Sequence, residues 1–147
     1  MKIVSACLAG INCNYKGESK PNKKVIELVK KGEAIPICPE QLGGLPTPRI
    51  PQEIQGFSGE KVLDGECKVL NKNGEDVTQE FIKGAHETLR IVKIYNCKEA
   101  ILKARSPSCG YGKTPDGTFS GKLINGNGVT AALLKRNGIK VYTEEDL

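Results

Sequence analysis

The sequence predicts a single-domain α/β protein, Rossmann-like and three-layered, with a mainly parallel sheet and long cysteine-bearing loops at the carboxyl edge of that sheet. Short β-branched segments alternate with helical segments, and this alternation is typical of a parallel sheet covered by helices on both faces. The length of 147 residues suits one domain with one hydrophobic core. We therefore expect a single domain spanning residues 1–147.

Four short segments predict the strands, because β-branched and other apolar residues dominate them. These segments are residues 2–6, 34–38, 99–104 and 139–142. Pro36 lies inside the second segment. Since proline cannot donate a hydrogen bond to a sheet, we expect that strand at an edge or a bulge.

Three segments show the spacing of apolar residues that indicates amphipathic helices. They are residues 22–31, 78–95 and 128–137. Gly32 follows the first as a C-terminal glycine, and Thr78 is expected to cap the second.

The segments 39–59 and 105–127 are rich in Pro and Gly, so we expect both to lack regular structure. Loops of this length inside a compact domain are usually functional. Between them, residues 66–77 predict a β-hairpin that turns at Asn73 and Gly74.

Composition excludes several classes of protein. Hydrophobic residues form 38% of the chain and charged residues 27%, which argues against a disordered chain. No apolar run approaches the length of a membrane span, and the first residues lack a secretory signal, so we expect a cytoplasmic protein. The net charge of +5 favours anionic partners only modestly. Six cysteines in a reducing compartment indicate metal binding, catalysis or burial rather than disulfides.

Three of these cysteines follow the expected strands. Cys7 lies just past the first strand, Cys38 ends the second, and Cys109 lies a few residues past the third. Because the carboxyl ends of parallel strands share one edge, we expect these residues to lie close together. Three thiolates favour zinc, copper(I) or an iron-sulfur cluster. Spacing alone leaves open the alternative that the cysteines only pack as small hydrophobic residues.

Two other signals are set aside. The segment 110–114 is similar to the end of a phosphate-binding loop, but Pro107 occupies the required first glycine position and Pro115 the start of the helix. His86 is the only histidine and falls within a long predicted helix, so we expect it on the helix surface or partly buried, without a catalytic role.

The residues around the three cysteines resemble the bacterial family known as domain of unknown function 523, which is represented by thiouracil desulfidases. The resemblance covers essentially the whole chain in three motifs, which are Ser5-Ala6-Cys7-Leu8-Ala9-Gly10-Ile11-Asn12-Cys13-Asn14-Tyr15-Lys16-Gly17, Cys38-Pro39-Glu40-Gln41-Leu42-Gly43-Gly44-Leu45-Pro46-Thr47-Pro48-Arg49 and Lys103-Ala104-Arg105-Ser106-Pro107-Ser108-Cys109-Gly110.

The resemblance implies a 4Fe-4S cluster held by Cys7, Cys38 and Cys109, with one iron not bound by protein. That iron would act as a Lewis acid on the sulfur of a thiolated pyrimidine while water attacks the adjacent carbon, giving the oxo-base and sulfide without net redox. The substrate expected is a 2- or 4-thiouracil-like base or nucleoside. A tRNA base is not favoured, because few aromatic side chains are available for stacking.

The resemblance also implies catalytic roles. Glu40 would transfer protons, and Ser106 and Ser108 would bind substrate or position water, although these side chains could instead satisfy loop amides. Arg49 and Arg105 could pair with carboxylates or meet a substrate phosphate.

The other cysteines have no assigned role in this interpretation. Cys13 is not counted as a ligand, although its closeness to Cys7 keeps it as a substitute ligand or redox partner. Cys67 and Cys97 are interpreted as bystanders. Two alternatives remain: a non-catalytic iron-sulfur or metal and sulfur carrier module that uses the same thiolates, and a zinc-stabilised binding domain.

Overall fold

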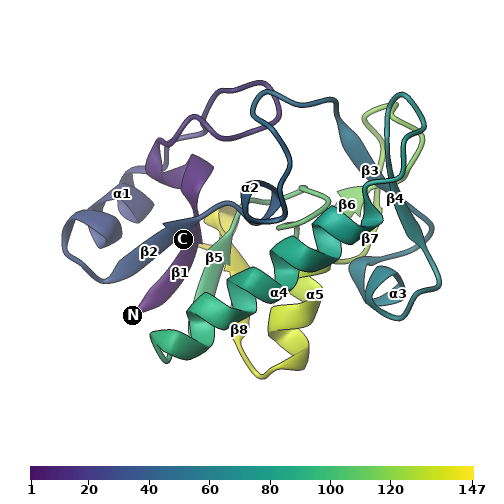
Figure 1. Ribbon diagram of the computed structural model, residues 1–147. Coiled ribbons are helices and arrows are strands. Elements are labelled where there is room, and N and C mark those ends of the chain that lie inside the picture. The colour runs from purple at the N-terminus through teal and green to yellow at the C-terminus, as the bar shows by residue number, and fades with distance from the viewer.

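A computed structural model describes residues 1–147 and contains a four-stranded parallel sheet with helices on both faces (Figure 1). The strand order is β2 (Ala34–Ile37), β1 (Lys2–Ser5), β5 (Glu99–Leu102) and β8 (Lys140–Thr143). β1 pairs in parallel with both β2 and β5, and β5 pairs in parallel with β8. The predicted α/β class with a mainly parallel sheet is therefore confirmed.

Alternation along the strands creates two hydrophobic layers. Ile3 of β1 belongs to the larger core, which contains Phe81 of α4 (Thr78–Ile94) and Leu134 of α5 (Val129–Arg136). The next residue, Val4, packs on the opposite face with Val25 of α1 (Lys23–Lys30). Because successive side chains of a strand point to opposite faces, α1 covers one side of the sheet and α4 and α5 cover the other.

The three predicted helices and the four predicted strands are present, with bounds that shift by up to two residues. Pro36 lies on β2, which is an edge strand, as proline requires. The cap assigned to Thr78 is wrong, because the N-cap of α4 is Val77. The Thr78 hydroxyl instead accepts a hydrogen bond from the backbone N–H of Val69 at 2.9 Å. His86 lies exposed on α4, as expected.

The expectation that residues 39–59 lack regular structure is wrong. This segment contains α2 (Pro39–Leu42) and β3 (Gln52–Gln55), and Gly59 begins α3 (Gly59–Leu63). Proline at the first position of α2 is compatible with a helix, since the missing N–H would have no intrahelical partner there.

The expected hairpin at residues 66–77 is only partly present. The turn occurs, with the Gly74 N–H bonded to the Asn71 carbonyl, but the returning arm makes a single bridge between Leu70 and Asp76. The strand β4 (Lys68–Asn71) pairs instead with β3 in an antiparallel sheet.

The segment 105–127 also contains regular structure, because β6 (Lys113–Pro115) and β7 (Leu123–Asn125) form an antiparallel hairpin. Both small sheets lie toward the same end of the molecule (Figure 1). Two 3-10 helices, η1 (Ala6–Ala9) and η2 (Glu144–Asp146), complete the structure. No helix of the structure is long and apolar enough to cross a membrane.

Candidate active site at the carboxyl edge of the sheet

The three strand-end cysteines reach the wall of one cavity of about 380 Å³. Cys7 lies in η1 directly after β1, Cys38 directly after β2, and Cys109 in the loop that follows β5. β1 lies between β2 and β5. The chain crosses from one side of β1 to the other between these strands, which is the switch point where ligands gather in open parallel sheets.

A glycine contact fixes the short helix that carries Glu40. A Cβ on Gly43, the C-cap of α2, would overlap the Glu80 carbonyl oxygen of α4, and a Cβ on Gly84 would overlap the Pro39 carbonyl oxygen. Since no side chain fits between the two backbones, α2 rests directly on α4. This contact holds Cys38 and Glu40 against the rigid core of the domain.

The segment before Cys109 is held by backbone contacts with α5. The first N–H groups of α5 donate to the loop: Val129 to the Pro107 carbonyl at 3.0 Å and Thr130 to the Ser108 carbonyl at 2.9 Å. Ser106 Oγ accepts from the N–H groups of Ser108 at 3.2 Å and Cys109 at 3.1 Å. Ser106 therefore satisfies turn amides, as one of the two interpretations stated, whereas no turn amide donates to the Ser108 hydroxyl.

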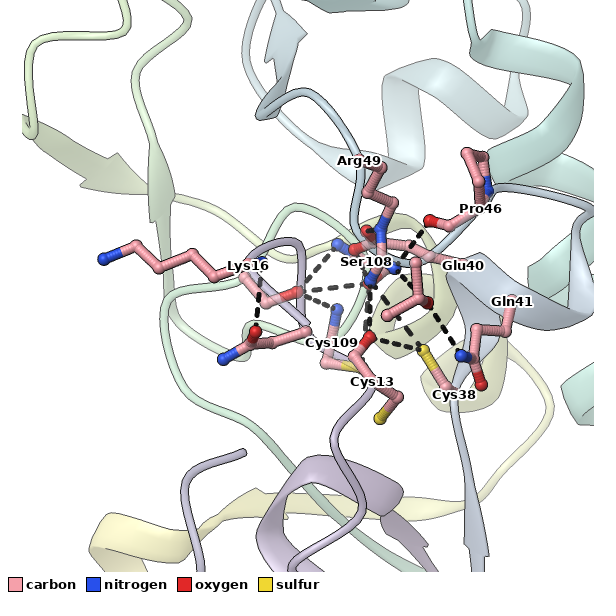
Figure 2. A network of polar contacts seen from close by, with 12 residues as sticks. Cys13, Lys16, Cys38, Glu40, Gln41, Pro46, Arg49, Ser108 and Cys109 are labelled. Atoms are coloured by element: carbon pink, nitrogen blue, oxygen red, sulfur yellow. Dashed lines mark hydrogen bonds and ion pairs between the residues drawn. The ribbon is translucent and has the colours of Figure 1, made fainter. Parts of the chain in front are cut away.

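Glu40 lies at the centre of a buried polar network (Figure 2). Its Oε1 accepts from Nε of Arg49 at 2.7 Å, and its Oε2 accepts from the Ser108 hydroxyl at 2.8 Å. The Ser106 and Ser108 hydroxyl oxygens are 3.1 Å apart. Because Ser108 uses its proton on Glu40, the geometry orders the chain as Ser106 to Ser108 to Glu40.

Arg49 joins this network to the cysteines. Its Nη2 donates to the Cys13 carbonyl at 2.9 Å and lies 4.0 Å from Cys38 Sγ, and its Nη1 donates to the Pro46 carbonyl and to Thr47 Oγ1, each at 3.1 Å. The side chain is only 4% exposed. The carboxylate interpretation of Arg49 is thus the one observed, and its partner is Glu40.

The environment shifts the pKa values of the cysteine thiols in different directions. Burial, together with the nearby Cys38, raises the pKa of Cys7 to about 11, and burial raises that of Cys109 to about 12. The pKa of Cys38 is lowered, chiefly because Cys13 hydrogen bonds to its sulfur, and that of Cys13 is raised in turn. Cysteines bind a metal or a cluster as thiolates, so thiols whose pKa is raised must release protons when the site takes up such a group.

The donor set suits an iron-sulfur cluster. Cys7, Cys38 and Cys109 line one cavity. Cysteine thiolates are the usual ligands of iron-sulfur clusters. The residues present therefore fit such a group.

Of the other residues named from the sequence, some line the cavity and some lie elsewhere. Cys13 is buried in the same cavity wall, beside Cys38. Arg105 also lines the cavity but pairs with Glu145 at 2.7 Å. Cys67 and Cys97 do not line the cavity.

Several residues of the cavity wall received no role from the sequence, and Lys103 and Glu53 are two of them. Lys103 lines the wall and forms an ion pair with Glu144 at 2.9 Å. Glu53 lines it from β3, inside the segment that we expected to be irregular. The only sequence signal for Glu53 in the site was its position shortly after the motif Cys38 to Arg49.

Fold and site together define a class of protein: a parallel α/β domain whose strand ends bring three cysteines and a buried glutamate network to one cavity. The sequence model of the 2-thiouracil desulfurase family matches residues 3–146, so the chain belongs to that family.

Two relatives extend this assignment. The chain is 50% identical over 147 residues to the uncharacterized protein YbbK of Bacillus subtilis (strain 168), covering 100% of this chain and 97% of YbbK. A solved structure described as the [4Fe-4S]-dependent thiouracil desulfidase TudS (DUF523Vcz) superposes with a TM-score of 0.88 at 42% identity, covering 99% of this chain and 91% of TudS. The predicted resemblance to the DUF523 thiouracil desulfidase-like family is confirmed.

Proposed function

We propose that this chain, as one domain of residues 1–147, is an iron-sulfur-cluster-dependent desulfidase that converts a thiolated pyrimidine and water into the oxo-base and sulfide. The observation that carries the proposal is the single cavity that Cys7, Cys38 and Cys109 share with the Glu40 network. Membership of the 2-thiouracil desulfurase family supports the reaction, and the TudS relative supports the cofactor.

The three cysteines would hold a 4Fe-4S cluster and leave one iron without a protein ligand. Such a cluster supplies Lewis-acid chemistry at the thiocarbonyl sulfur. The reaction balances as one thiocarbonyl and one water giving one carbonyl and one hydrogen sulfide, with no electron transferred.

Glu40 accepts the proton that the attacking water loses. The Arg49 guanidinium stabilises the negative carboxylate and fixes one oxygen, and Ser108 fixes the other. Each carboxylate oxygen retains a second acceptor site, so Glu40 can bind a water while both contacts are kept. A positioned carboxylate of this kind contributes about 10²–10⁴ in rate.

Ser106 and Ser108 hold the carboxylate and the turn together. Ser106 is partly exposed, whereas Ser108 is buried between Ser106 and Glu40. We assign Ser108 to the orientation of Glu40, and Ser106 to contact with substrate or water at the open end of the chain of hydroxyls.

The cavity favours a small substrate over a tRNA. A volume of about 380 Å³ is within the range of pockets that enclose one small molecule. The chain has no Trp and only three Phe and four Tyr, which leaves few rings to stack bases of an extended RNA strand.

The test is anaerobic reconstitution of the cluster, followed by incubation with 2-thiouracil and 4-thiouracil and measurement of sulfide and oxo-base in equal amounts. A carrier module with the same thiolates would bind the cluster and release no sulfide from either base. A zinc-stabilised binding domain would be recognised by zinc, in place of iron, in protein purified without oxygen.

A further inference from the structure

Glu53 is a second carboxylate in the wall of the cavity that the proposed chemistry leaves unused. It lies on β3, two residues after Pro51, and is 9% exposed. Its Oε1 accepts two backbone hydrogen bonds from the turn between β6 and β7: from Gly117 N–H at 2.9 Å and from Phe119 N–H at 3.1 Å. This oxygen ties β3 to the β6–β7 hairpin, whose Pro115 lines the cavity.

The other oxygen of Glu53, Oε2, receives no hydrogen bond from the chain. Thr130 Oγ1 is the only fully buried side-chain polar atom without a partner, so Oε2 still contacts open space. Because Glu53 lines the cavity and is only 9% exposed, we take the cavity to be the space that this oxygen faces. A ligand that donates to this carboxylate oxygen in a largely enclosed site forms a charge-assisted hydrogen bond, which is stronger than one between neutral groups.

Glu53 differs in this respect from Glu40, Lys103 and Arg105, which also line the cavity. Both Glu40 oxygens have partners, and Lys103 and Arg105 are paired with carboxylates of the C-terminal segment. The free oxygen of Glu53 is therefore an acceptor placed where a small ligand would lie, and an ionised carboxylate is an acceptor only.

We propose that Glu53 binds the substrate by accepting a ring N–H of the thiolated pyrimidine, which rests on the desulfidase function proposed above. Uracil-type rings carry N–H donors at N1 and N3, so the chemistry that Glu53 recognises is an unsubstituted ring nitrogen. If the donor is N3–H, nucleosides are accepted as well as free bases. If it is N1–H, only free bases are accepted.

The experiment compares kcat/KM for 2-thiouracil, 1-methyl-2-thiouracil and 3-methyl-2-thiouracil on anaerobically reconstituted wild-type and Glu53→Gln proteins. In Glu53→Gln the amide oxygen still accepts from the hairpin N–H groups, and the amide nitrogen replaces the free oxygen. We expect one methyl position to lower wild-type kcat/KM by about 10- to 100-fold, as the loss of a hydrogen bond to a charged group does. For Glu53→Gln, kcat/KM on 2-thiouracil should fall by a similar factor, through a higher KM. Its kcat/KM should fall little further on the methylated base that the wild type discriminates against.

Gln55 provides the matched control. Its Nε2 donates to the Gly117 carbonyl of the same turn at 3.0 Å, but Gln55 does not line the cavity. Gln55→Ala should therefore keep wild-type kcat/KM, and iron content should be unchanged in both variants.

Equal kcat/KM for wild type and Glu53→Gln on 2-thiouracil would overturn this inference, as would a methyl penalty of the same size in both proteins. Tolerance of both methyl groups by the wild type would overturn it without any variant. If the wild type releases no sulfide from 2-thiouracil, the proposed function fails instead, so the two failures are distinguishable.

Discussion

Arg49 and Glu40 form a buried ion pair, with Nε 2.7 Å from Oε1 and side-chain exposures of 4% and 10%. The pair links the short helix after β2 to the loop that follows it, nine residues further along the chain. Removal of one member of a buried pair leaves the other charged and unpaired.

Arg49→Ala is therefore expected to lower the free energy of unfolding by about 3–5 kcal/mol. The remaining Glu40 carboxylate would lose its cation, and the Cys13 carbonyl would lose its guanidinium donor. Urea denaturation of the protein before cluster loading measures this loss. The exposed pair of Arg90 and Glu87 is the control, since Arg90→Ala should cost at most about 1 kcal/mol. Equal losses for the two variants would contradict the role given to the buried pair.

Glu40→Gln separates chemistry from structure. An amide oxygen can still accept from Arg49, so we expect iron content and the absorption of the cluster to remain. The charge that accepts the proton is gone, so kcat should fall by about 10²–10⁴. Sulfide release and iron content, measured on the same sample, check both halves. Loss of the cluster together with activity would make Glu40 a structural residue.

The two serines should differ in effect. Ser108→Ala leaves the buried Glu40 Oε2 without its donor, so both kcat and the melting temperature should fall. Ser106→Ala removes the acceptor for two N–H groups, so its melting temperature should fall as well, but Glu40 keeps both of its partners. Thermal unfolding and kcat for the pair test this assignment, which a larger loss of kcat in Ser106→Ala than in Ser108→Ala would refute.

Gly84→Ala is expected to destabilise the protein, although it places an alanine inside a helix. Alanine normally stabilises the interior of a helix by about 0.5–1 kcal/mol relative to glycine. In α4 the new methyl group would meet the Pro39 carbonyl of α2, so we expect destabilisation of about 1–3 kcal/mol and displacement of Cys38 and Glu40. Lys83→Ala, at the neighbouring exposed position, should leave unfolding and iron content unchanged. A stabilised Gly84→Ala protein would show that the close contact is not required.

The parallel sheet could be predicted because its signals are local. The β-branched strands and amphipathic helices carry their period in the sequence, and the positions of Cys7 and Cys38 at strand ends followed from that reading. The pairing of β3 with β4 could not be predicted, because β3 lies among prolines and glycines and becomes a strand only through a partner distant in sequence.

Convergence in the site was predictable for the cysteines and less so for their partners. Arg49 had a carboxylate as one of two expected partners, but nothing in the sequence fixed Glu40 as that carboxylate. Glu53 carries no local motif, and its role in the cavity depends on the turn at Gly117 and Phe119, more than sixty residues away. Such contacts arise only when the tertiary structure is formed.

The most direct test of cluster-dependent desulfidation is a paired measurement on Cys109→Ser and Cys67→Ser, with iron content and sulfide release from 2-thiouracil determined for each after anaerobic reconstitution. The proposal predicts that Cys109→Ser loses both iron and sulfide release, whereas Cys67→Ser, which lies outside the cavity wall, retains both. Undiminished sulfide release by Cys109→Ser without bound iron would contradict it.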